Sequence, residues 1–443
     1  MMVIEKIENA VIHSEKFKKL LDEFSEKRLI SIKGLSNSSR ALILSLLFKE
    51  YNSNFIYITH DEDDAEIIKD DLETLLDDKK VAFLPDQKDR PYEVVFKDTY
   101  RKSLFQEGLE KIIDPEPVFT VTTSKVLYKK LPSSDYLKKQ KLTVQTGESS
   151  DFEIFKSLLM DLGFSREPFV ESCGEMSVHG GIIDIFPYSN ENPIRIEFFG
   201  DEIESIREFN ITTQRSIRSI SEIDIYPQYP EDQDLSDHTD YVSLFDYFDQ
   251  KDILILDGKK IIQKQICESY EEAEEQYLHK KNKQGLLAPE DVFIKWELLE
   301  EKIDSFKTIS FNFQSTKNED IIDFSVIPQA SLKGNFHLLK NQIDGILDRF
   351  KKNVLIYFFC ESQDQVERLE EIMSDIGIDT SRIQFAVYPL NQGFIFPDIN
   401  LALFTDNQFY GRIRRRLKIK RFSGGLSFRQ LKSLTKGDYV VHI

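Results

Sequence analysis

The chain has 443 residues, 40% of them hydrophobic, and a formal net charge of −19. This length suggests several domains of ~100–200 residues, and the acidic balance argues against nucleic-acid binding over most of the surface. Three widely spaced cysteines do not suit a disulfide framework, no apolar run approaches the ~20 residues that span a bilayer, and the N-terminus is too polar for a signal peptide. We therefore expect a cytoplasmic protein with no membrane partner.

Buried strands alternate with helices in roughly the first 140 residues. Apolar strands are predicted at 29–32, 55–58, 81–84 and 118–121, and helices at 36–51 and 61–76. Carboxylates in the first turn of the second helix favour its start through the helix dipole. This alternation is typical of a parallel α/β sheet.

The loop after the first strand is where a P-loop protein would bind nucleotide phosphates. A working P-loop has the pattern G-x-x-x-x-G-K-[ST]: glycines let backbone N–H groups wrap the phosphates, the lysine neutralises them and the hydroxyl binds magnesium. This chain keeps Gly34, but Ser39, Arg40 and Ala41 replace the second glycine, the lysine and the hydroxyl. The pattern fits either a chance strand–turn–helix or a P-loop fold that has lost its site. Loss of the metal ligand and the tight-turn glycine together should abolish nucleotide binding.

Residues 173–219 have the pattern of consecutive short antiparallel strands. An apolar run at 182–186 is followed by Ile194, Ile196 and Phe198, which alternate with charged residues in the period-two signature of a half-buried strand. One face of this meander is predicted to be core. Mixed charges on the other face are usual for a solvated surface, and the pattern alone favours that interpretation.

The end of the apolar strand predicted at residues 252–256 is a second place where a nucleotide-hydrolysing motor would carry functional residues, although strands often end in an ordinary Asp-Gly turn. A hydrolysing motor needs an acid pair here, one for magnesium and one to activate water, whereas Asp257 is followed by Gly258 and Lys259. Residues 353–359 have the apolar pattern of another buried strand, and a helix is predicted after it.

Basic residues cluster near the C-terminus, at Arg412, Arg414, Arg415, Arg416 and Lys418, followed by Lys420 and Arg421. It is the one place in the acidic chain suited to phosphates. A charge run between domains is most often a solvated linker, and the alternative role is a contact with DNA or with an acidic partner surface.

The sequence contains no recognisable catalytic constellation. Its seven histidines do not stand at metal-ligand spacing with cysteine or carboxylate. Ser38, Ser39 and Ser362 have no recognisable partner base. We expect no catalysis, metal or cofactor in this chain.

The segments GGIIDIFP, PIRIEFFGDEIESIREF and TTQRS, within residues 173–219, resemble a small β-domain of bacterial excision-repair proteins. That family comprises the UvrB subunit and the transcription-repair coupling factors, and in both the domain docks onto the damage-recognition subunit UvrA. The resemblance implies a docking face at Arg166, His179, Arg195 and Glu197. His179 stands where the family usually has arginine, so docking is expected to be weaker or the partner adapted, because histidine lacks the bidentate guanidinium fork.

The degraded P-loop separates the two members of the family, since UvrB keeps an intact motif and the UvrB-like half of the coupling factors has lost it. The resemblance to the coupling factors covers essentially the whole chain. It implies a degenerate P-loop, RecA-like parallel-sheet domain with an inserted small antiparallel β-rich domain, followed by a second small α/β domain. The implied boundaries are 1–143 and 228–329 for the degenerate domain, 144–227 for the UvrA-binding domain, 330–425 for the small α/β domain, and 426–443 for a linker and the first strand of an RNA-polymerase-interacting domain.

Because that strand stops at Ile443, we expect a fragment of a longer protein. The implied role is recruitment of UvrA to lesions marked by stalled RNA polymerase, in transcription-coupled nucleotide excision repair. ATP, magnesium, RNA polymerase and double-stranded DNA are expected to bind other parts of the longer protein, which include its translocase motor. Two alternatives stay open: a divergent UvrB-like ATPase or helicase subunit, and a stand-alone UvrA-binding adaptor.

Overall fold

The computed structural model describes residues 3–86, 92, 99–227, 241–280, 286–311, 321–350 and 354–411. They fall into two compact units. One combines Met1–Val95, Gly108–Ser133 and Asp232–Arg416, and the other is centred on residues 134–231. The predicted fold class, α/β with a parallel sheet and an antiparallel β-rich domain, is confirmed.

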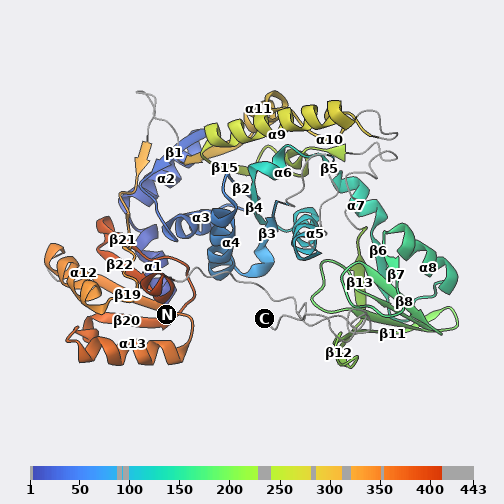
Figure 1. Ribbon diagram of the computed structural model, residues 1–443. Coiled ribbons are helices and arrows are strands. Elements are labelled where there is room, and N and C mark those ends of the chain that lie inside the picture. The colour runs from blue at the N-terminus through green and yellow to red at the C-terminus, as the bar shows by residue number, and fades with distance from the viewer. Residues whose placement is uncertain are drawn as a thin grey trace, which may run out of the picture. The chain divides into compact units, whose positions relative to one another are not determined.

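The first unit contains a seven-stranded sheet in which all neighbouring strands run parallel (Figure 1). In spatial order its strands are β17 (Ile321–Asp323), β1 (Leu29–Lys33), β16 (Lys307–Phe311), β15 (Ile253–Asp257), β2 (Phe55–Thr59), β4 (Phe119–Thr123) and β3 (Val81–Leu84). Parallel sheets are normally covered on both faces, so their central strands are continuous apolar runs. Every residue of β2 and β15 is buried, and the strands predicted in the first 140 residues are all present within two residues of their predicted ends.

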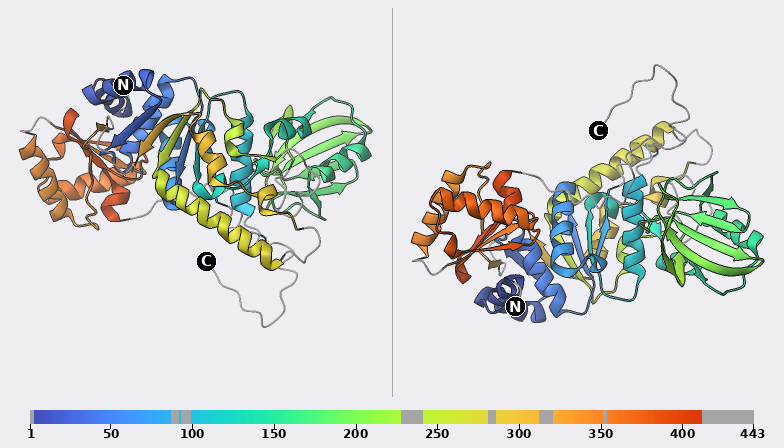
Figure 2. Two further views of the ribbon diagram at one scale, coloured as in Figure 1. Left: turned by 90° about the horizontal axis from the view of Figure 1, so that it is seen from above. Right: turned by 90° about the horizontal axis from the view of Figure 1, so that it is seen from below.

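Helices lie on both faces of this sheet. α3 (Ser39–Glu50) and α4 (Glu62–Leu76) lie on one face and α9 (Lys259–Lys280) on the other (Figure 1, Figure 2). α4 begins one residue later than predicted, because Asp61 is its N-cap and accepts a hydrogen bond from the Asp64 N–H at 2.8 Å. α3 begins three residues later than predicted, because Asn37 has a left-handed φ of 55° that an α-helix cannot include.

Shorter elements complete this part of the chain. The helices are α1 (Val3–Ile12), α2 (Glu15–Glu26), α5 (Thr99–Ile113), α6 (Ser124–Leu127), α10 (Pro289–Val292) and α11 (Trp296–Ile303). The strands β5 (Leu131–Pro132) and β14 (Tyr241–Val242) form an antiparallel pair.

A five-stranded sheet and its helices form a second α/β domain within the first unit, which we call the five-stranded domain. Its order is β18 (Ile327–Pro328), β21 (Phe394–Phe396), β22 (Leu401–Thr405), β19 (Leu355–Cys360) and β20 (Ile383–Val387), and its helices are α12 (Phe336–Arg349), α13 (Gln363–Asp375) and α14 (Asp406–Tyr410). β19 pairs in parallel with both neighbours, whereas β21 is antiparallel to β22 and β18. α13 begins with a capping box between Ser362 and Gln365, and it is the helix predicted after the strand at residues 353–359.

The second unit is a twisted six-stranded sheet. Its order is β12 (Ser216–Ile220), β11 (Glu202–Phe209), β10 (Ile194–Phe199), β9 (Ile182–Ile185), β8 (Glu175–His179) and β7 (Ser165–Arg166). The strands are antiparallel except for the β7–β8 pair. β6 (Leu142–Gln145) pairs with β13 (Glu222–Ile225), and α8 (Phe152–Asp161) packs its Phe155 and Leu159 into the same core as β10. α7 (Ser134–Gln140) precedes these elements.

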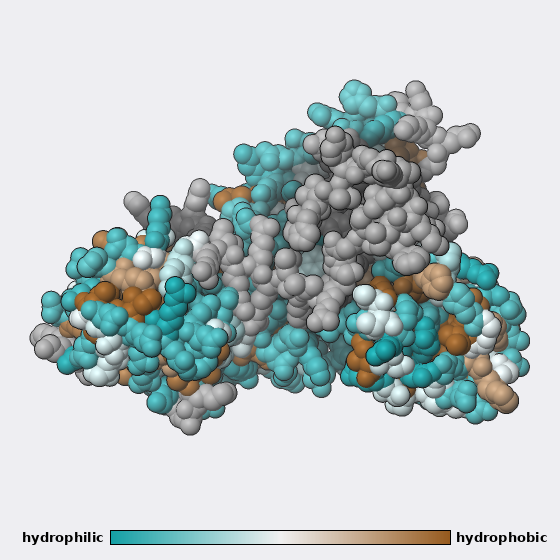
Figure 3. All heavy atoms as spheres, turned by 60° about the horizontal axis from the view of Figure 1, so that its bottom comes forward, coloured by the Kyte–Doolittle hydropathy of each residue, from teal (hydrophilic) through white to brown (hydrophobic). Residues whose placement is uncertain are grey.

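The surface matches the acidic, polar composition. On the face drawn in Figure 3, hydrophilic residues cover most of the surface that is not grey, and hydrophobic residues form small separate patches. Across the described segments, no helix is both long enough and apolar enough to cross a membrane.

Candidate functional site

The loop that was predicted to be a degenerate P-loop joins β1 to α3, and hydrogen bonds of its own side chains hold it together. Gly34 has a φ of +72°, and a Cβ there would stand 2.3 Å from Asp323 Oδ1, so glycine is required. The Ser39 hydroxyl donates to the Ser36 carbonyl at 2.5 Å and accepts from the Ser36 N–H at 3.0 Å. The Ser36 N–H is therefore used inside the loop, where a working P-loop would present such donors to a phosphate.

Arg40 occupies the position of the P-loop lysine, but it is bound by two carboxylates of its own domain. Its Nη2 lies 2.6 Å from Asp64 Oδ1, and its Nη1 contacts Asp257 Oδ2. The Tyr57 hydroxyl accepts a hydrogen bond from Arg40 at 3.2 Å and donates one to Asp257 at 2.6 Å. The guanidinium charge is thus balanced by the protein itself, and we call these four residues the Arg40 cluster.

The Arg40 cluster is largely buried, so separating Arg40 from its carboxylates would leave buried charges without a partner. The side chain of Asp257 is only 2% exposed and that of Arg40 17%. Burial on its own lowers the pKa of Arg40, but Tyr57, Asp64 and Asp257 together raise it above its ordinary value. A nucleotide phosphate would have to displace carboxylates from Arg40 while adding negative charge beside them. The cluster therefore opposes phosphate binding.

A loop of the five-stranded domain contacts the N-terminal end of α3. The Asn37 side-chain amide donates to the Gly393 carbonyl at 2.8 Å, and the Gln392 N–H donates to the Ser38 hydroxyl at 2.9 Å. This end of a helix is where a P-loop holds phosphates. Here the neighbouring domain occupies part of that region with its own backbone.

Asp71, on α4, anchors the same loop. It is fully buried and accepts from the Asn391 N–H at 2.8 Å and from the Asn391 side-chain amide at 3.1 Å. Burial raises the pKa of Asp71 to about 7, although hydrogen bonds from Ser38 and Asn391 act in the opposite direction. A carboxyl group with a pKa near neutral pH thus lies in the contact between the seven-stranded domain and the five-stranded domain.

The six-stranded sheet places three of the four predicted docking residues on one face. His179, Ile182, Glu197 and Ser205 form one cross-strand row, and Ser177, Asp184, Arg195 and Arg207 form the next. Alternate residues of a strand point to the same face, so both rows lie opposite the core residues of β10. The alternation predicted from the sequence is confirmed by the burial of Ile194, Ile196 and Phe198.

Two of these residues are tied into ion pairs. Arg195 makes two 2.8 Å contacts with the carboxylate of Asp184, which is 5% exposed, and lies over the ring of Phe209 at 4.6 Å. This hydrogen-bonded pairing with Asp184 raises the pKa of Arg195. Glu197 pairs with Arg207 and accepts from Ser205 at 2.8 Å. Arg195 and Glu197 therefore also hold the sheet together, and charge reversal at Arg195 would place two carboxylates side by side.

Arg166 and His179 are both exposed. His179 Nε2 lies 2.8 Å from the Pro168 carbonyl, and its ring centroid is 5.4 Å from that of Phe169. Arg166 lies on the edge strand β7 in register with Met176, a core residue, so it does not belong to the two rows of the other three. The predicted basic cluster, Arg412, Arg414, Arg415, Arg416 and Lys418, lies outside the described residues.

The side-chain partners in the first unit were not predicted from the sequence. Asp64 was recognised only as a carboxylate of a helix start, and Asp257 only as part of a degraded strand end. Tyr57 carried a usable signal, because a hydroxyl inside a fully apolar strand needs a buried partner. Asp71 and Asn391 are 320 residues apart and carried no such signal.

Comparisons with known proteins agree with the resemblance. Residues 142–229 match the family described as the UvrB interaction domain. Over 99% of its length the chain is 26% identical to the transcription-repair-coupling factor of Bacillus subtilis, and over 93% it is 24% identical to that of Staphylococcus aureus. The chain is a relative of the transcription-repair-coupling factors. It spans only 43% and 41% of the length of those two proteins.

Removal of the Arg40 side chain should strongly destabilise this relative of the coupling factors. Arg40→Ala leaves Asp64 and Asp257 facing each other without a cation, and the expected loss in free energy of unfolding is ~3–5 kcal/mol. Urea denaturation measures it. Lys33→Ala is the control, because Lys33 pairs with Asp323 at the surface of the same domain, where ion pairs contribute about 0–1 kcal/mol. Equal losses for the two variants would contradict the role of the cluster.

Asp71 should make the stability of the first unit depend on pH. Its folded pKa of about 7 lies above the ordinary aspartate value, so its contribution is present at low pH and lost as the pH rises through about 7. Asp71→Asn should keep the contacts to Asn391 and reduce the stability difference between pH 5.5 and pH 8, by roughly 1–4 kcal/mol. Denaturation at both pH values is the measurement. The exposed Asp22→Asn variant should behave as wild type, and an unchanged pH dependence in Asp71→Asn would contradict the assignment.

Proposed function

We propose that this chain recruits UvrA to lesions that have stalled RNA polymerase, as the UvrA-binding part of a transcription-repair coupling factor. The observation that carries the proposal is the match of residues 142–229 to the UvrB interaction domain. The charged face described above lies within this segment. The reaction class is recruitment, with no chemical step in this chain.

The docking face is proposed to combine two kinds of residue. Arg195 and Glu197 are held in place by Asp184 and Arg207, so their side chains lose little freedom on binding. Exposed charges at an interface rim mainly accelerate association and select the partner. Arg166 and His179 fit that second role.

The nucleotide-dependent work of the longer protein is assigned to parts outside this chain. We propose that its ATP, magnesium, RNA polymerase and double-stranded DNA bind there. The Arg40 cluster supports this assignment, because it already neutralises the residue that would meet phosphate. The basic residues from Arg412 to Lys418 stay a predicted contact with DNA or with an acidic partner.

The UvrA-docking face is tested by charge reversal at its exposed positions. Arg166→Glu and His179→Glu should each weaken binding of purified UvrA about tenfold, since each replaces a basic side chain by a carboxylate at the interface. Biolayer interferometry with immobilised chain measures the affinity, and circular dichroism checks the fold. Lys139→Glu is the charge-matched control, on α7 and exposed. Wild-type affinity in both face variants would show that UvrA binds elsewhere.

Nucleotide binding separates the proposal from the divergent-ATPase alternative. The chain should give no saturable heat with Mg-ATP at millimolar concentration in isothermal titration. The triple variant Ser39→Gly, Arg40→Lys, Ala41→Thr restores the P-loop pattern but should not restore binding. Its lysine still faces Asp64 and Asp257, and the loop at Gln392 still contacts α3. A saturable micromolar signal from the unmodified chain would favour an ATPase.

A further inference from the structure

Two exposed phenylalanines lie on the charged face of the six-stranded sheet. Among the described leucine, isoleucine, valine, methionine and phenylalanine side chains, Phe199 and Phe169 are the most exposed, at 78% and 62%. Both belong to residues 142–229, the segment that matches the UvrB interaction domain. Phenylalanine is among the residues most often buried, and exposed apolar side chains that gather on one surface mark an interaction site.

Phe199 continues the docking face along β10. Alternate residues of a strand share a face, so Phe199 lies on the side of Glu197, whereas Phe198 between them is in the core. Glu197 pairs with Ile182 on β9, and Ile182 pairs with His179 on β8. Two strand spacings, roughly 10 Å, separate β8 from β10. Phe199 and His179 are therefore close to each other at the same end of the sheet.

Phe169 reaches this end of the sheet from the loop between β7 and β8. Its ring centroid is 5.4 Å from that of His179. The carbonyl of the preceding Pro168 accepts a hydrogen bond from His179 Nε2 at 2.8 Å. The following Val170 is buried and packs with Cys173 in a small core. The loop thus buries one apolar side chain and leaves the next one, Phe169, exposed beside His179.

Hydrogen bonds hold the loop that carries Phe169 in place. The carboxylate of Glu175 accepts from the N–H of Glu171 at 2.7 Å and from the N–H of Ser172 at 2.9 Å. A side chain that is already held in position loses little conformational freedom when a partner binds. An ordered, exposed aromatic ring is well suited to anchor a protein interface.

We propose that Phe169 and Phe199 are apolar anchors of the UvrA-docking face, each of which fits an apolar recess on UvrA. This assignment rests on the proposed function and adds the chemistry of the contact. Interfaces combine a core rich in aromatic residues with a polar rim, and Arg166, His179 and Glu197 supply that rim. The ring of Phe169 contributes affinity at the position where His179 lacks the guanidinium fork of an arginine.

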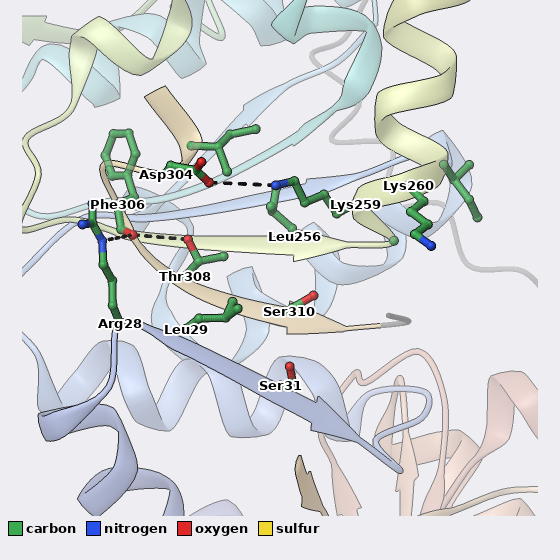
Figure 4. A pocket seen from close by; sticks show the side chains of 13 residues that line it. Arg28, Leu29, Ser31, Leu256, Lys259, Lys260, Asp304, Phe306, Thr308 and Ser310 are labelled. Atoms are coloured by element: carbon green, nitrogen blue, oxygen red, sulfur yellow. Dashed lines mark hydrogen bonds and ion pairs between the residues drawn. The ribbon is translucent and has the colours of Figure 1, made fainter. Parts of the chain in front are cut away.

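A further group of exposed apolar side chains lies in a pocket of about 430 Å³ on the seven-stranded sheet (Figure 4). Leu29 and Ile261 line this pocket and are 55% and 46% exposed. Lys259, at its edge, is paired with Glu300 at 3.0 Å. The pocket lies outside residues 142–229, so it is not part of the segment that matches the interaction domain. It provides a control surface for UvrA binding.

Alanine variants of the two phenylalanines test the anchors. Phe169→Ala and Phe199→Ala should each weaken binding of purified UvrA to the full chain about tenfold, because an anchor side chain is lost. Biolayer interferometry at about 0.1 M and about 0.5 M salt is the measurement. Salt screens exposed charges and leaves apolar contacts intact, so the tenfold ratio should persist at both concentrations. The effect of Arg166→Glu should shrink at the higher one.

Two exposed aliphatic residues are the controls. Ile154 is 60% exposed on α8, a helix that packs against the core side of the same sheet, and Leu29 lies in the pocket of the first unit. Ile154→Ala and Leu29→Ala should both bind UvrA as wild type does. Thermal unfolding should be unchanged in all four alanine variants, because each removes an exposed side chain.

The possible outcomes separate the anchors from the proposed function. Wild-type affinity in Phe169→Ala and Phe199→Ala, with weaker binding by Arg166→Glu, would overturn the anchors and leave the docking face in place. A loss of affinity that disappears at about 0.5 M salt would overturn the apolar contact. An equal loss in Ile154→Ala or Leu29→Ala would overturn its location. A wild-type chain that does not bind UvrA would overturn the proposed function itself and the anchors with it.

Discussion

The balance of charge around Arg40 is the interaction on which the first unit depends. A guanidinium that is largely buried needs negative charge close by, and a P-loop protein obtains that balance from a bound nucleotide. Here Asp64 and Asp257 provide it permanently, and Tyr57 links them through its hydroxyl. The cluster joins α3, α4, the middle of β2 and the end of β15. The charge of Arg40 is therefore balanced within the protein, at the position where a P-loop protein would bind a phosphate.

The contact at Asp71 extends this arrangement to the neighbouring five-stranded domain. Nucleotide-driven proteins use a terminal phosphate to move adjacent segments, because the phosphate contacts both sides of a mobile junction. In this chain protein groups occupy both sides: Asn391 and Gln392 contact Asp71 and Ser38 directly. Direct hydrogen bonds between protein groups therefore hold this junction together.

The sequence predicted the strands of the first 140 residues well, but it predicted neither their order in the sheet nor the side-chain partners. Apolar runs such as that of β2 are determined by burial on both faces, and the start of α4 by a local hydrogen bond from the Asp64 N–H to Asp61. Both can therefore be predicted from a short stretch of sequence. The departures from the P-loop pattern were visible at Ser39, Arg40 and Ala41. The carboxylates that balance the charge of Arg40 were not visible, because Arg40 and Asp257 are 217 residues apart in the chain and meet only through the order of the strands in the sheet.

The two-residue period of β10 connects the core of the second unit to its proposed docking face. Ile194 and Ile196 must point inward, so Arg195 and Glu197 must point outward, and a shift of one residue would exchange the two sets. An outward arginine would ordinarily be a solvated charge. Asp184 changes this, because a nearly buried carboxylate requires a partner and holds Arg195 in one orientation. The requirement to neutralise Asp184 and the presentation of an ordered charge to a partner are therefore met by the same side chain.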